Sequence, residues 1–381
     1  MSIAFIDLKA QRARLKPRID AAVARVLDHG GYVLGPEVGQ FEAQLAAFGG
    51  AHHALSCANG TDALALPLMA WGIGRGDAVF CPSFTFAATA EVVPWFDATP
   101  VFVDILPDTY NMDPASLERA IVEVKSRGEL IPRAIIAVDL FGQPADYPRI
   151  AEIARRHGLK LIADSAQGFG STLDSLHPLH WADVATTSFF PAKPLGAYGD
   201  GGAVLSNDDE LHATLLSLRV HGQGTDKYDN VRIGMNSRLD TLQAAILIEK
   251  LAVFPEEVVW RGRIADRYAQ GLAGAVTTPT VIAGGVSTWA QYTIETEDRD
   301  GLAAHLKALG VPTAIYYPRP LHAQTAYAGY PAVGNGLPVT MAKAGRVLSL
   351  PMHADLTEAD QDYIVAAVRD YVEGGAKVAV G

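Results

Sequence analysis

The feature that most restricts the fold of this chain is a repeated order of short apolar runs and amphipathic helical segments. The apolar runs have the length of strands, and they lie at 53–58, 78–81, 100–104, 133–140, 160–163, 184–189 and 202–206. Most of them are followed by a segment with the apolar spacing of a helix. This alternation is typical of a mostly parallel sheet with helices on both faces, so the sequence predicts an α/β fold.

The pattern changes towards the C-terminus. A long helix is expected over about 239–254, and from about residue 251 the order becomes helix, strand, helix with charged faces. A length of 381 residues is sufficient for one large domain and a smaller one. We therefore predict a large domain with an N-terminal arm at 1–250 and a small α+β domain at 251–381.

Charge and composition exclude several classes of function. The formal net charge of −11 would repel nucleic acids and anionic membrane surfaces, although a local arginine cluster could still bind a small anion. The first residues lack the apolar core of a signal peptide, and no apolar stretch is long enough to span a bilayer. Cys57 and Cys81 lie in apolar runs and are expected to be buried free thiols. We expect a cytosolic protein that needs no metal or disulfide.

Lys193 is distinguished from the other lysines by its surroundings. It lies between two apolar runs, with Pro191, Pro194 and Gly196 around it and GDGG following at 199–202. Prolines fix φ and glycines permit positive φ, so this segment predicts a tight turn that holds the lysine at strand ends. A desolvated lysine has a lowered pKa and can attack a carbonyl carbon to form a Schiff base.

Asp164 ends the predicted strand LKLIAD, at the carboxyl edge where open α/β sheets bind their ligands. Its carboxylate could pair with a protonated pyridine nitrogen and keep the ring cationic. The alternative is an N-cap for a helix that begins at SAQG. Gln167 could donate to a phenolic oxygen of the same ring, or it could be the N3 partner in a capping box.

An anion site is predicted where the run at 53–58 meets the next helix. A dianionic phosphate needs backbone N–H donors at a helix N-terminus, and Gly60 and Thr61 provide them, with the Thr61 hydroxyl as a further donor. Ser188, at the end of a later strand, could reach the same phosphate. Phe86 is either a core aromatic or a side chain that stacks on a bound ring.

Six motifs occur in this order along the chain: NGTDAL (59–64), PSFTFAATAE (82–91), ADSAQGFG (163–170), SFFPAKPLGAYGDGG (188–202), RVHG (219–222) and MNSRLDTLQAAIL (235–247). Together they resemble the DegT/DnrJ/EryC1/StrS family of sugar aminotransferases, which use pyridoxal phosphate on a fold of type I. The resemblance runs from FIDL at 5–8 to LSLPMH at 348–353. It implies that residues 1–250 form the cofactor-binding domain.

The resemblance implies a role for each matching residue. Lys193 would form the Schiff base with pyridoxal phosphate, Asp164 would pair with the pyridine nitrogen, and Gln167 would contact the ring hydroxyl. Phe86 occupies the ring-stacking position. The phosphate would be held by Gly60, Thr61, Ser188 and, from a neighbouring subunit, Asn236. The use of Asn236 across an interface implies an obligate homodimer with two shared active sites.

Within the family, the chain most resembles enzymes that aminate C3 of a UDP-linked 2-acetamido-3-keto uronic acid. In those relatives the arginine that matches Arg238 is implicated in gripping the sugar carboxylate, which a planar guanidinium suits. Arg238 could equally pair with Asp240 at the start of a helix. One departure is Tyr316, before Tyr317 and Pro318, where those relatives tend to have histidine. His322 could line the same sugar pocket or lie in a solvated loop.

The resemblance implies a two-stage transfer of an amino group from glutamate to a nucleotide-linked keto-sugar, in the synthesis of cell-surface polysaccharide (O-antigen) precursors. A 4-keto-6-deoxy sugar nucleotide is the alternative acceptor. A sugar dehydratase is disfavoured because such relatives replace the lysine at 193 with histidine. A nicotinamide dehydrogenase is disfavoured because the Gly-rich run at 72–76 precedes a strand instead of following one. Nothing resembles the added DNA-binding domain of a regulatory protein.

Overall fold

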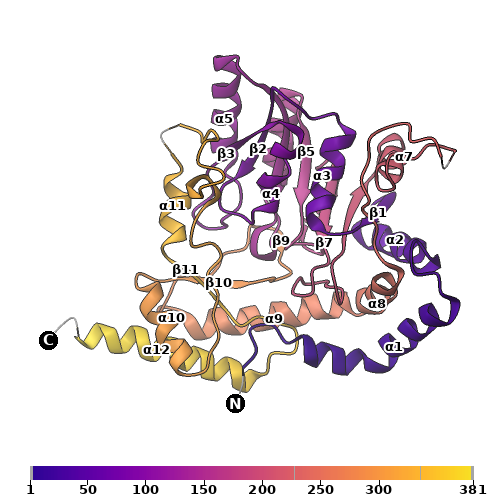
Figure 1. Cartoon of the computed structure of the whole chain (residues 1–381). Coiled ribbons are helices and arrows are strands. Elements are labelled where there is room, and N and C mark those ends of the chain that lie inside the picture. Colours follow the sequence, from indigo (N-terminus) through magenta and orange to yellow (C-terminus); the bar gives the residue numbers. More distant parts are fainter. Residues whose placement is uncertain (1–2, 227, 335, 379–381) are drawn as a thin grey trace.

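The computed structural model describes residues 3–226, 228–334 and 336–378 and contains the α/β fold expected from the sequence (Figure 1). At its centre is a seven-stranded sheet with the order β1-β8-β7-β5-β4-β2-β3. The strands are β1 (His53–Cys57), β2 (Asp77–Pro82), β3 (Thr99–Val103), β4 (Ile131–Val138), β5 (Lys160–Asp164), β7 (Val184–Ser188) and β8 (Gly202–Ser206). Strands β3, β2, β4, β5 and β7 are parallel, and β8 runs antiparallel to both of its neighbours, β7 and β1. The prediction of a mostly parallel sheet is therefore confirmed.

Helices surround this sheet (Figure 1). They are α2 (Pro36–Gly49), α3 (Gly60–Ala70), α4 (Ala88–Glu91), α5 (Pro114–Arg127), α6 (Tyr147–His157), α7 (Asp209–Leu218) and α8 (Thr241–Leu251), with α1 (Leu8–His29) packed on α8. Local sequence explains their limits. Asp113 caps the amides of Ala115 and Ser116 at the start of α5, and Gly128 ends α5 with a positive φ.

The C-terminal part contains α9 (Phe254–Leu272), β10 (Tyr292–Glu295), α10 (Arg299–Ala308), α11 (Pro338–Ala344), β11 (Val347–Leu350) and α12 (Glu358–Val378). Strands β10 and β11 pair in antiparallel fashion, and the two-residue strands β6 (Thr172–Leu173) and β9 (Gly285–Val286) form a second small pairing. The helix predicted over about 239–254 is present as α8, but it is shorter and ends at Leu251. A new helix, α9, begins at Phe254 because Pro255 lacks an N–H and is suited to the first turn of a helix.

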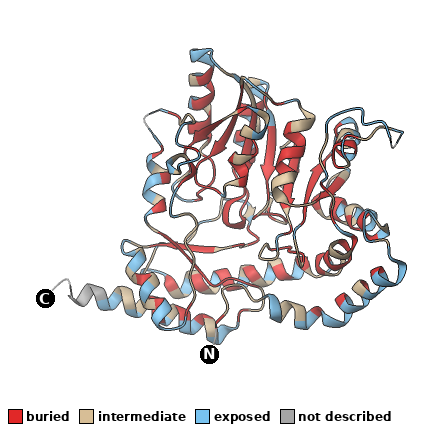
Figure 2. Ribbon diagram, viewed as in Figure 1, coloured by how far each residue is buried: buried red, intermediate tan, exposed pale blue. Residues whose placement is uncertain are grey.

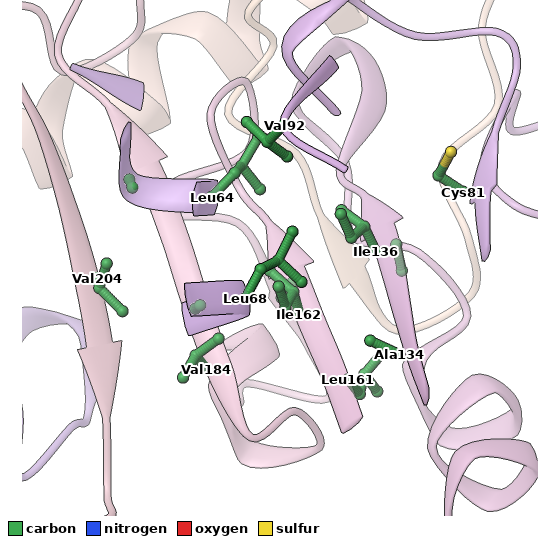
Figure 3. Close-up of a cluster of buried hydrophobic side chains, with 14 of the residues drawn as sticks. Leu64, Leu68, Cys81, Val92, Ala134, Ile136, Leu161, Ile162, Val184 and Val204 are labelled. Carbon is green, nitrogen blue, oxygen red and sulfur yellow. The ribbon is translucent and has the colours of Figure 1, made fainter. Parts of the chain in front are cut away.

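The hydrophobic core lies between the central sheet and its helices (Figure 2). Figure 3 shows Leu64 and Leu68 of α3 in one cluster with Ile162 of β5 and Val184 of β7. A separate cluster joins α9, β10, α10, β11 and α12 in the C-terminal part. The division at residue 250 stays a prediction, because residues 321, 327, 333 and 337 belong to the first core although they lie in the C-terminal part.

The edge strand β3 is covered by this C-terminal segment. The amide of Phe102 donates to the carbonyl of Pro331 at 2.9 Å, and the amide of Val333 donates to the carbonyl of Phe102 at 3.0 Å. These bonds form a short parallel bridge between Phe102 and Ala332. The backbone groups of an edge strand that would otherwise face water are partly satisfied in this way.

The structure also describes the two cysteines and shows whether any helix could cross a membrane. Cys57 and Cys81 are buried and free, as predicted, and burial raises the pKa of both thiols. In the part of the chain that the structure describes, no helix combines the length and the apolar character needed to cross a membrane.

Phe80 of β2 is fully buried in the core, which gives a test of the fold. We expect Phe80→Ala to lower the free energy of unfolding by about 3–5 kcal/mol, because it removes apolar burial and leaves a cavity. The measurement is denaturant unfolding monitored by circular dichroism. Trp95→Ala is the matched control, since Trp95 is exposed and its loss should change the free energy by at most about 0.5 kcal/mol. Equal effects of the two substitutions would contradict the described core.

Candidate active site

A cavity of about 740 Å³ lies at the carboxyl ends of the parallel strands. Strands β4, β5 and β7 deliver residues from their last positions, which is where a parallel sheet presents its ligand-binding groups. The C-terminal part closes the cavity with residues from the segments before β10 and after α10. The side chains and glycines around it include Asn59, Gly60, Thr61, Phe86, Thr89, Asp164, Gln167, Ser188, Phe190, Lys193, Asp200, Gln291, Tyr316, Tyr317 and Gln324.

Asp164 is buried at the end of β5, and its carboxylate is held by two donors. The Thr89 hydroxyl donates to Oδ2 at 2.8 Å, and the amide of Ala166 donates to Oδ1 at 3.2 Å. Burial raises the pKa of Asp164, while these hydrogen bonds and the charge of Lys193 oppose the rise. No helix follows Asp164, so the alternative of an N-cap is wrong. The next residues form a turn that presents the carboxylate to the cavity.

Lys193 lies in the tight turn that the prolines and glycines predicted. Its amide donates to the carbonyl of Phe190 at 2.8 Å, and a Cβ at Gly196 would lie 2.4 Å from the carbonyl oxygen of Pro191. The side chain is half-buried and lines the cavity. Desolvation lowers the pKa of Lys193, and the nearby carboxylate of Asp164 opposes this change. A lowered pKa increases the share of neutral amine, which is the nucleophilic form.

The turn between β1 and α3 forms a cradle for an anion. Asn59 caps α3 by accepting from the amide of Asp62 at 2.8 Å. Among the described residues, the amides of Gly60 and Thr61 have no protein acceptor, so both are free to bind a ligand at the helix N-terminus. A Cβ at Gly60 would lie 2.6 Å from Cβ of Ser188, which shows how closely β7 approaches this turn.

Two aromatic side chains are exposed although they lie in the walls of a cavity. Phe86 has 56 % of its surface exposed, and Phe190 has 52 %. Such exposure is unfavourable for a large apolar side chain unless a bound molecule covers it. The residues around the cavity fit pyridoxal phosphate. The anion cradle matches its phosphate, the carboxylate of Asp164 its ring nitrogen, the amine of Lys193 its aldehyde, and the exposed aromatic side chains its ring face.

Gln167 lies in the cavity wall, but its side chain already has partners. Its Oε1 accepts from the amide of Phe141 at 2.8 Å, and its Nε2 donates to the Tyr317 hydroxyl at 3.0 Å. The alternative of a capping box is wrong because no helix starts here. The second N–H of Nε2 is left for a ring hydroxyl, so the implied contact stays a prediction. Tyr316 and Tyr317 both line the cavity, as expected for a substrate pocket.

Three of the predicted residues do not line this cavity. His322 lines a different cavity, together with Asp104 and Met341, and its Nδ1 forms a 2.7 Å hydrogen bond with the Ser83 hydroxyl. Asn236 is exposed and Arg238 is half-buried, both in the segment that leads into α8. The alternative of an Arg238–Asp240 ion pair is not formed in the described chain. Neither residue reaches the cavity of its own chain.

A family model for the DegT/DnrJ/EryC1/StrS aminotransferases matches residues 13–369. The chain belongs to this aminotransferase family. It is 49 % identical over 96 % of its length to the UDP-2-acetamido-2-deoxy-3-oxo-D-glucuronate aminotransferase of Pseudomonas aeruginosa, and the match covers 99 % of that protein.

Solved structures of the family give the same result. A DegT DnrJ EryC1 StrS aminotransferase of Brucella abortus superimposes with a TM-score of 0.96 at 55 % identity, over 97 % of this chain and 99 % of that one. NtdA of Bacillus subtilis, solved with bound cofactor PMP, gives a TM-score of 0.88 at 30 % identity, over 98 % of this chain and 85 % of that one. The family and fold read from the six motifs are therefore confirmed.

Sequence reasoning about this aminotransferase missed several residues of the cavity. Thr89, which binds Asp164, lies within the PSFTFAATAE motif, but only the fold shows which of its threonines reaches the carboxylate. Phe190 follows Ser188 in another motif, so its aromatic character was visible although its exposure was not. Gln291 comes from the C-terminal part and had no sequence signal.

The Thr89–Asp164 bond gives a prediction for the pH dependence of this aminotransferase. The bond lowers the pKa of Asp164, so Thr89→Val should raise it further. Asp164 would then become protonated at a higher pH and would lack the charge needed to pair with a cationic ring, the role that the resemblance implies for it. We expect the acidic limb of the pH–rate profile to move to higher pH, measured with steady-state kinetics across the acidic range. An unchanged acidic limb would contradict this assignment of the limb to Asp164.

Proposed function

We propose that this enzyme transfers an amino group from glutamate to C3 of UDP-linked 2-acetamido-2-deoxy-3-keto-glucuronic acid, a precursor step for cell-surface polysaccharide such as O-antigen. The observation that carries the chemistry is the meeting of Lys193, Asp164 and the cradle at Gly60 in one cavity. The observation that supports the sugar is the identity of 49 % to a Pseudomonas aeruginosa enzyme named for the corresponding 3-oxo-glucuronate.

The cofactor is pyridoxal phosphate, which family membership and a PMP-bound neighbour confirm. When bound, it supplies an aldehyde that accepts amines and a ring that withdraws electrons. Gly60, Thr61 and Ser188 would hold its phosphate, mainly through charge-assisted hydrogen bonds worth roughly 1.5–3 kcal/mol each. Phe86 would cover the ring, and the free N–H of Gln167 would face the ring hydroxyl.

Two side chains of this enzyme handle the protons. Lys193 Nζ is the base and the acid. Its lowered pKa makes the neutral amine available to take a proton from the Cα of glutamate in the first half-reaction, and its ammonium form would donate a proton to C3 of the acceptor sugar in the second. Asp164 holds a proton at the ring nitrogen, and Thr89 helps it to remain ionised. General acid–base transfer of this kind contributes roughly 10²- to 10⁴-fold to the rate.

The two half-reactions use the same cavity in turn. In the first, glutamate gives up its amino group and leaves as 2-oxoglutarate, with its keto oxygen supplied by a water molecule and the amino group retained by the enzyme. In the second, the keto-sugar nucleotide enters, its C3 carbonyl oxygen leaves as water, and the amine remains on C3. Tyr316 and Tyr317, which line the cavity, would contact the sugar. Tyr316 is also the reason to keep a 4-keto-6-deoxy sugar nucleotide as the second candidate acceptor.

We further propose a homodimer in which each cavity is completed by the partner chain. Residues 32–34 and the connection from α7 to α8 expose large apolar side chains, among them Tyr32, Val33, Val231 and Ile233, the last with 88 % of its surface exposed. The two segments are linked by the 3.1 Å bond from the Thr241 amide to the Tyr32 carbonyl. Exposed apolar patches of this kind are typical of interfaces.

In Figure 1 the connection from α7 projects away from the sheet, on the side of α2 and α1. Asn236 and Arg238 follow this connection, and we propose that they enter a partner's cavity, Asn236 towards the phosphate and Arg238 towards the sugar carboxylate. The free thiols of Cys57 and Cys81 are consistent with a reducing compartment, and we propose that the enzyme acts in the cytoplasm.

Absorbance spectroscopy tests the proposed chemistry directly. The purified protein with added pyridoxal phosphate should show a visible absorbance band that bleaches with glutamate. Lys193→Ala should alter this band and abolish turnover, because it removes both the cofactor link and the proton carrier. Lys307→Ala, an exposed lysine on α10, is the control and should behave like the wild type.

Addition of the two candidate acceptors to the bleached enzyme then distinguishes them. Restoration of the band by the UDP-linked 3-keto uronic acid supports the proposal, whereas restoration only by a 4-keto-6-deoxy sugar nucleotide supports the second candidate. A wild-type protein without a band would contradict the role of Lys193.

Mixing two inactive variants tests the shared sites. We expect Lys193→Ala and the double variant Asn236→Ala, Arg238→Ala each to be inactive alone. Denatured together in equal amounts and refolded, they should regain about a quarter of wild-type activity, because half of the dimers are mixed and each mixed dimer has one intact site. The wild type, denatured and refolded alone, is the control. No recovery from the mixture would mean that each cavity uses residues of one chain only.

A further inference from the structure

Asp139 is a second buried carboxylate near the cavity, and the proposed mechanism does not use it. It directly follows β4, next to Asp164 at the end of β5, and its side chain is fully buried. It does not belong to the lining of the cavity. A buried carboxylate is unfavourable unless donors compensate it, so its presence here calls for a physical reason.

The two oxygens of Asp139 have different partners. Oδ2 accepts from the Ser165 hydroxyl at 2.6 Å. Oδ1 accepts from the Tyr147 hydroxyl at 2.7 Å and from the Ala145 amide at 3.2 Å. Oδ2 therefore holds the turn after β5, while Oδ1 holds the segment that leads into α6.

The turn after β5 is held to Asp139 at two further points. The amide of Asp139 donates to the carbonyl of Asp164 at 3.0 Å. A Cβ at Gly168 would lie 2.3 Å from Cβ of Asp139, so the turn packs directly on this side chain. Asp164 directly precedes this turn and Gln167 lies in it, and these residues are assigned to the ring nitrogen and the ring hydroxyl of the cofactor.

The electrostatic setting is unfavourable for a residue that only fills space. Burial and the charge of Asp164 raise the pKa of Asp139 to about 7, although its three donors lower it. The titratable groups that contribute to this shift are Asp164 from β5 and Tyr147 from α6, and neither is a cation. An apolar residue would avoid this cost, so the carboxylate has a role that depends on its oxygens.

We infer that Asp139 is a positioning residue that fixes, through Ser165 and the main chain of Asp164, the turn that presents Asp164 and Gln167 to the cofactor. This inference rests on the proposed function, because the positioned groups act in the amino transfer. The bonds of Oδ1 to Tyr147 and Ala145 serve the fold instead. The two sides of one carboxylate can therefore be separated by mutation.

The experiment compares Asp139→Asn, Ser165→Ala, the double variant of both, and Tyr147→Phe. Ser165→Ala removes the partner of Oδ2, and Tyr147→Phe removes a partner of Oδ1 as the matched control. Asp139→Asn keeps the shape but leaves only one acceptor oxygen. Each variant is measured for its melting temperature, its dissociation constant for pyridoxal phosphate, its absorbance maximum with cofactor, and the rate of the half-reaction with saturating glutamate.

We expect Asp139→Asn and Ser165→Ala each to slow the half-reaction by about tenfold to a hundredfold, because misplacing a reacting group by about 1 Å costs about a hundredfold. They should also weaken pyridoxal phosphate binding and shift the absorbance maximum. The glutamate concentration that gives half the maximal rate should change little. The double variant should be no slower than the slower single variant, since both changes break one interaction. Tyr147→Phe should lower the melting temperature and leave the other readouts unchanged.

Two results would overturn the inference. One is a Ser165→Ala variant that, like Tyr147→Phe, changes only the melting temperature. The other is a double variant whose effect on the half-reaction is the product of the two single effects. The wild type separates this inference from the proposed function. If the wild type fails to react with glutamate, the proposed function fails, and cofactor affinity in Ser165→Ala alone decides whether the turn is positioned as inferred.

Discussion

The candidate site depends on two ionisable side chains, the buried Asp164 and the half-buried Lys193, which face one cavity at the carboxyl edge of the sheet. Desolvation acts on the two groups in opposite directions, raising the pKa of the acid and lowering that of the amine, and their mutual attraction opposes both changes. The pair persists because its surroundings are rigid. The core of β4, β5 and β7 fixes the strand ends, the Thr89 hydroxyl holds the Asp164 carboxylate, and the amide of Lys193 is bonded to the carbonyl of Phe190 in its turn.

Close packing of the backbone explains the glycines around the cofactor cradle. At Gly60 and Gly202 a Cβ would collide with Ser188 and with the backbone of Asn59, so only glycine allows β7, β8 and the start of α3 to come this close. This close approach brings the free amides of α3 next to the Ser188 hydroxyl. The anion site is therefore a consequence of backbone packing more than of any charged side chain.

Much of the candidate site could be predicted from the sequence, because parallel strands present their last residues at one edge of the sheet. Asp164, Ser188 and Lys193 were assigned to that edge from strand patterns and turn residues alone. The partners of Gln167 could not be predicted, because they are a backbone amide and a tyrosine 150 residues away. The place of His322 could not be predicted for the same reason, because only the fold shows that its Nδ1 is hydrogen-bonded to the Ser83 hydroxyl outside the lining of this cavity.

The bridge between Phe102 and Ala332 has a consequence for how the chain is made. During synthesis from the N-terminus, β3 can pair with β2 long before residues 331–333 leave the ribosome. Until then its outer edge carries unpaired N–H and C=O groups that could pair with another chain. The C-terminal part thus acts as a late cover for the sheet, and a nascent or truncated chain that lacks it is more prone to aggregate than the complete one.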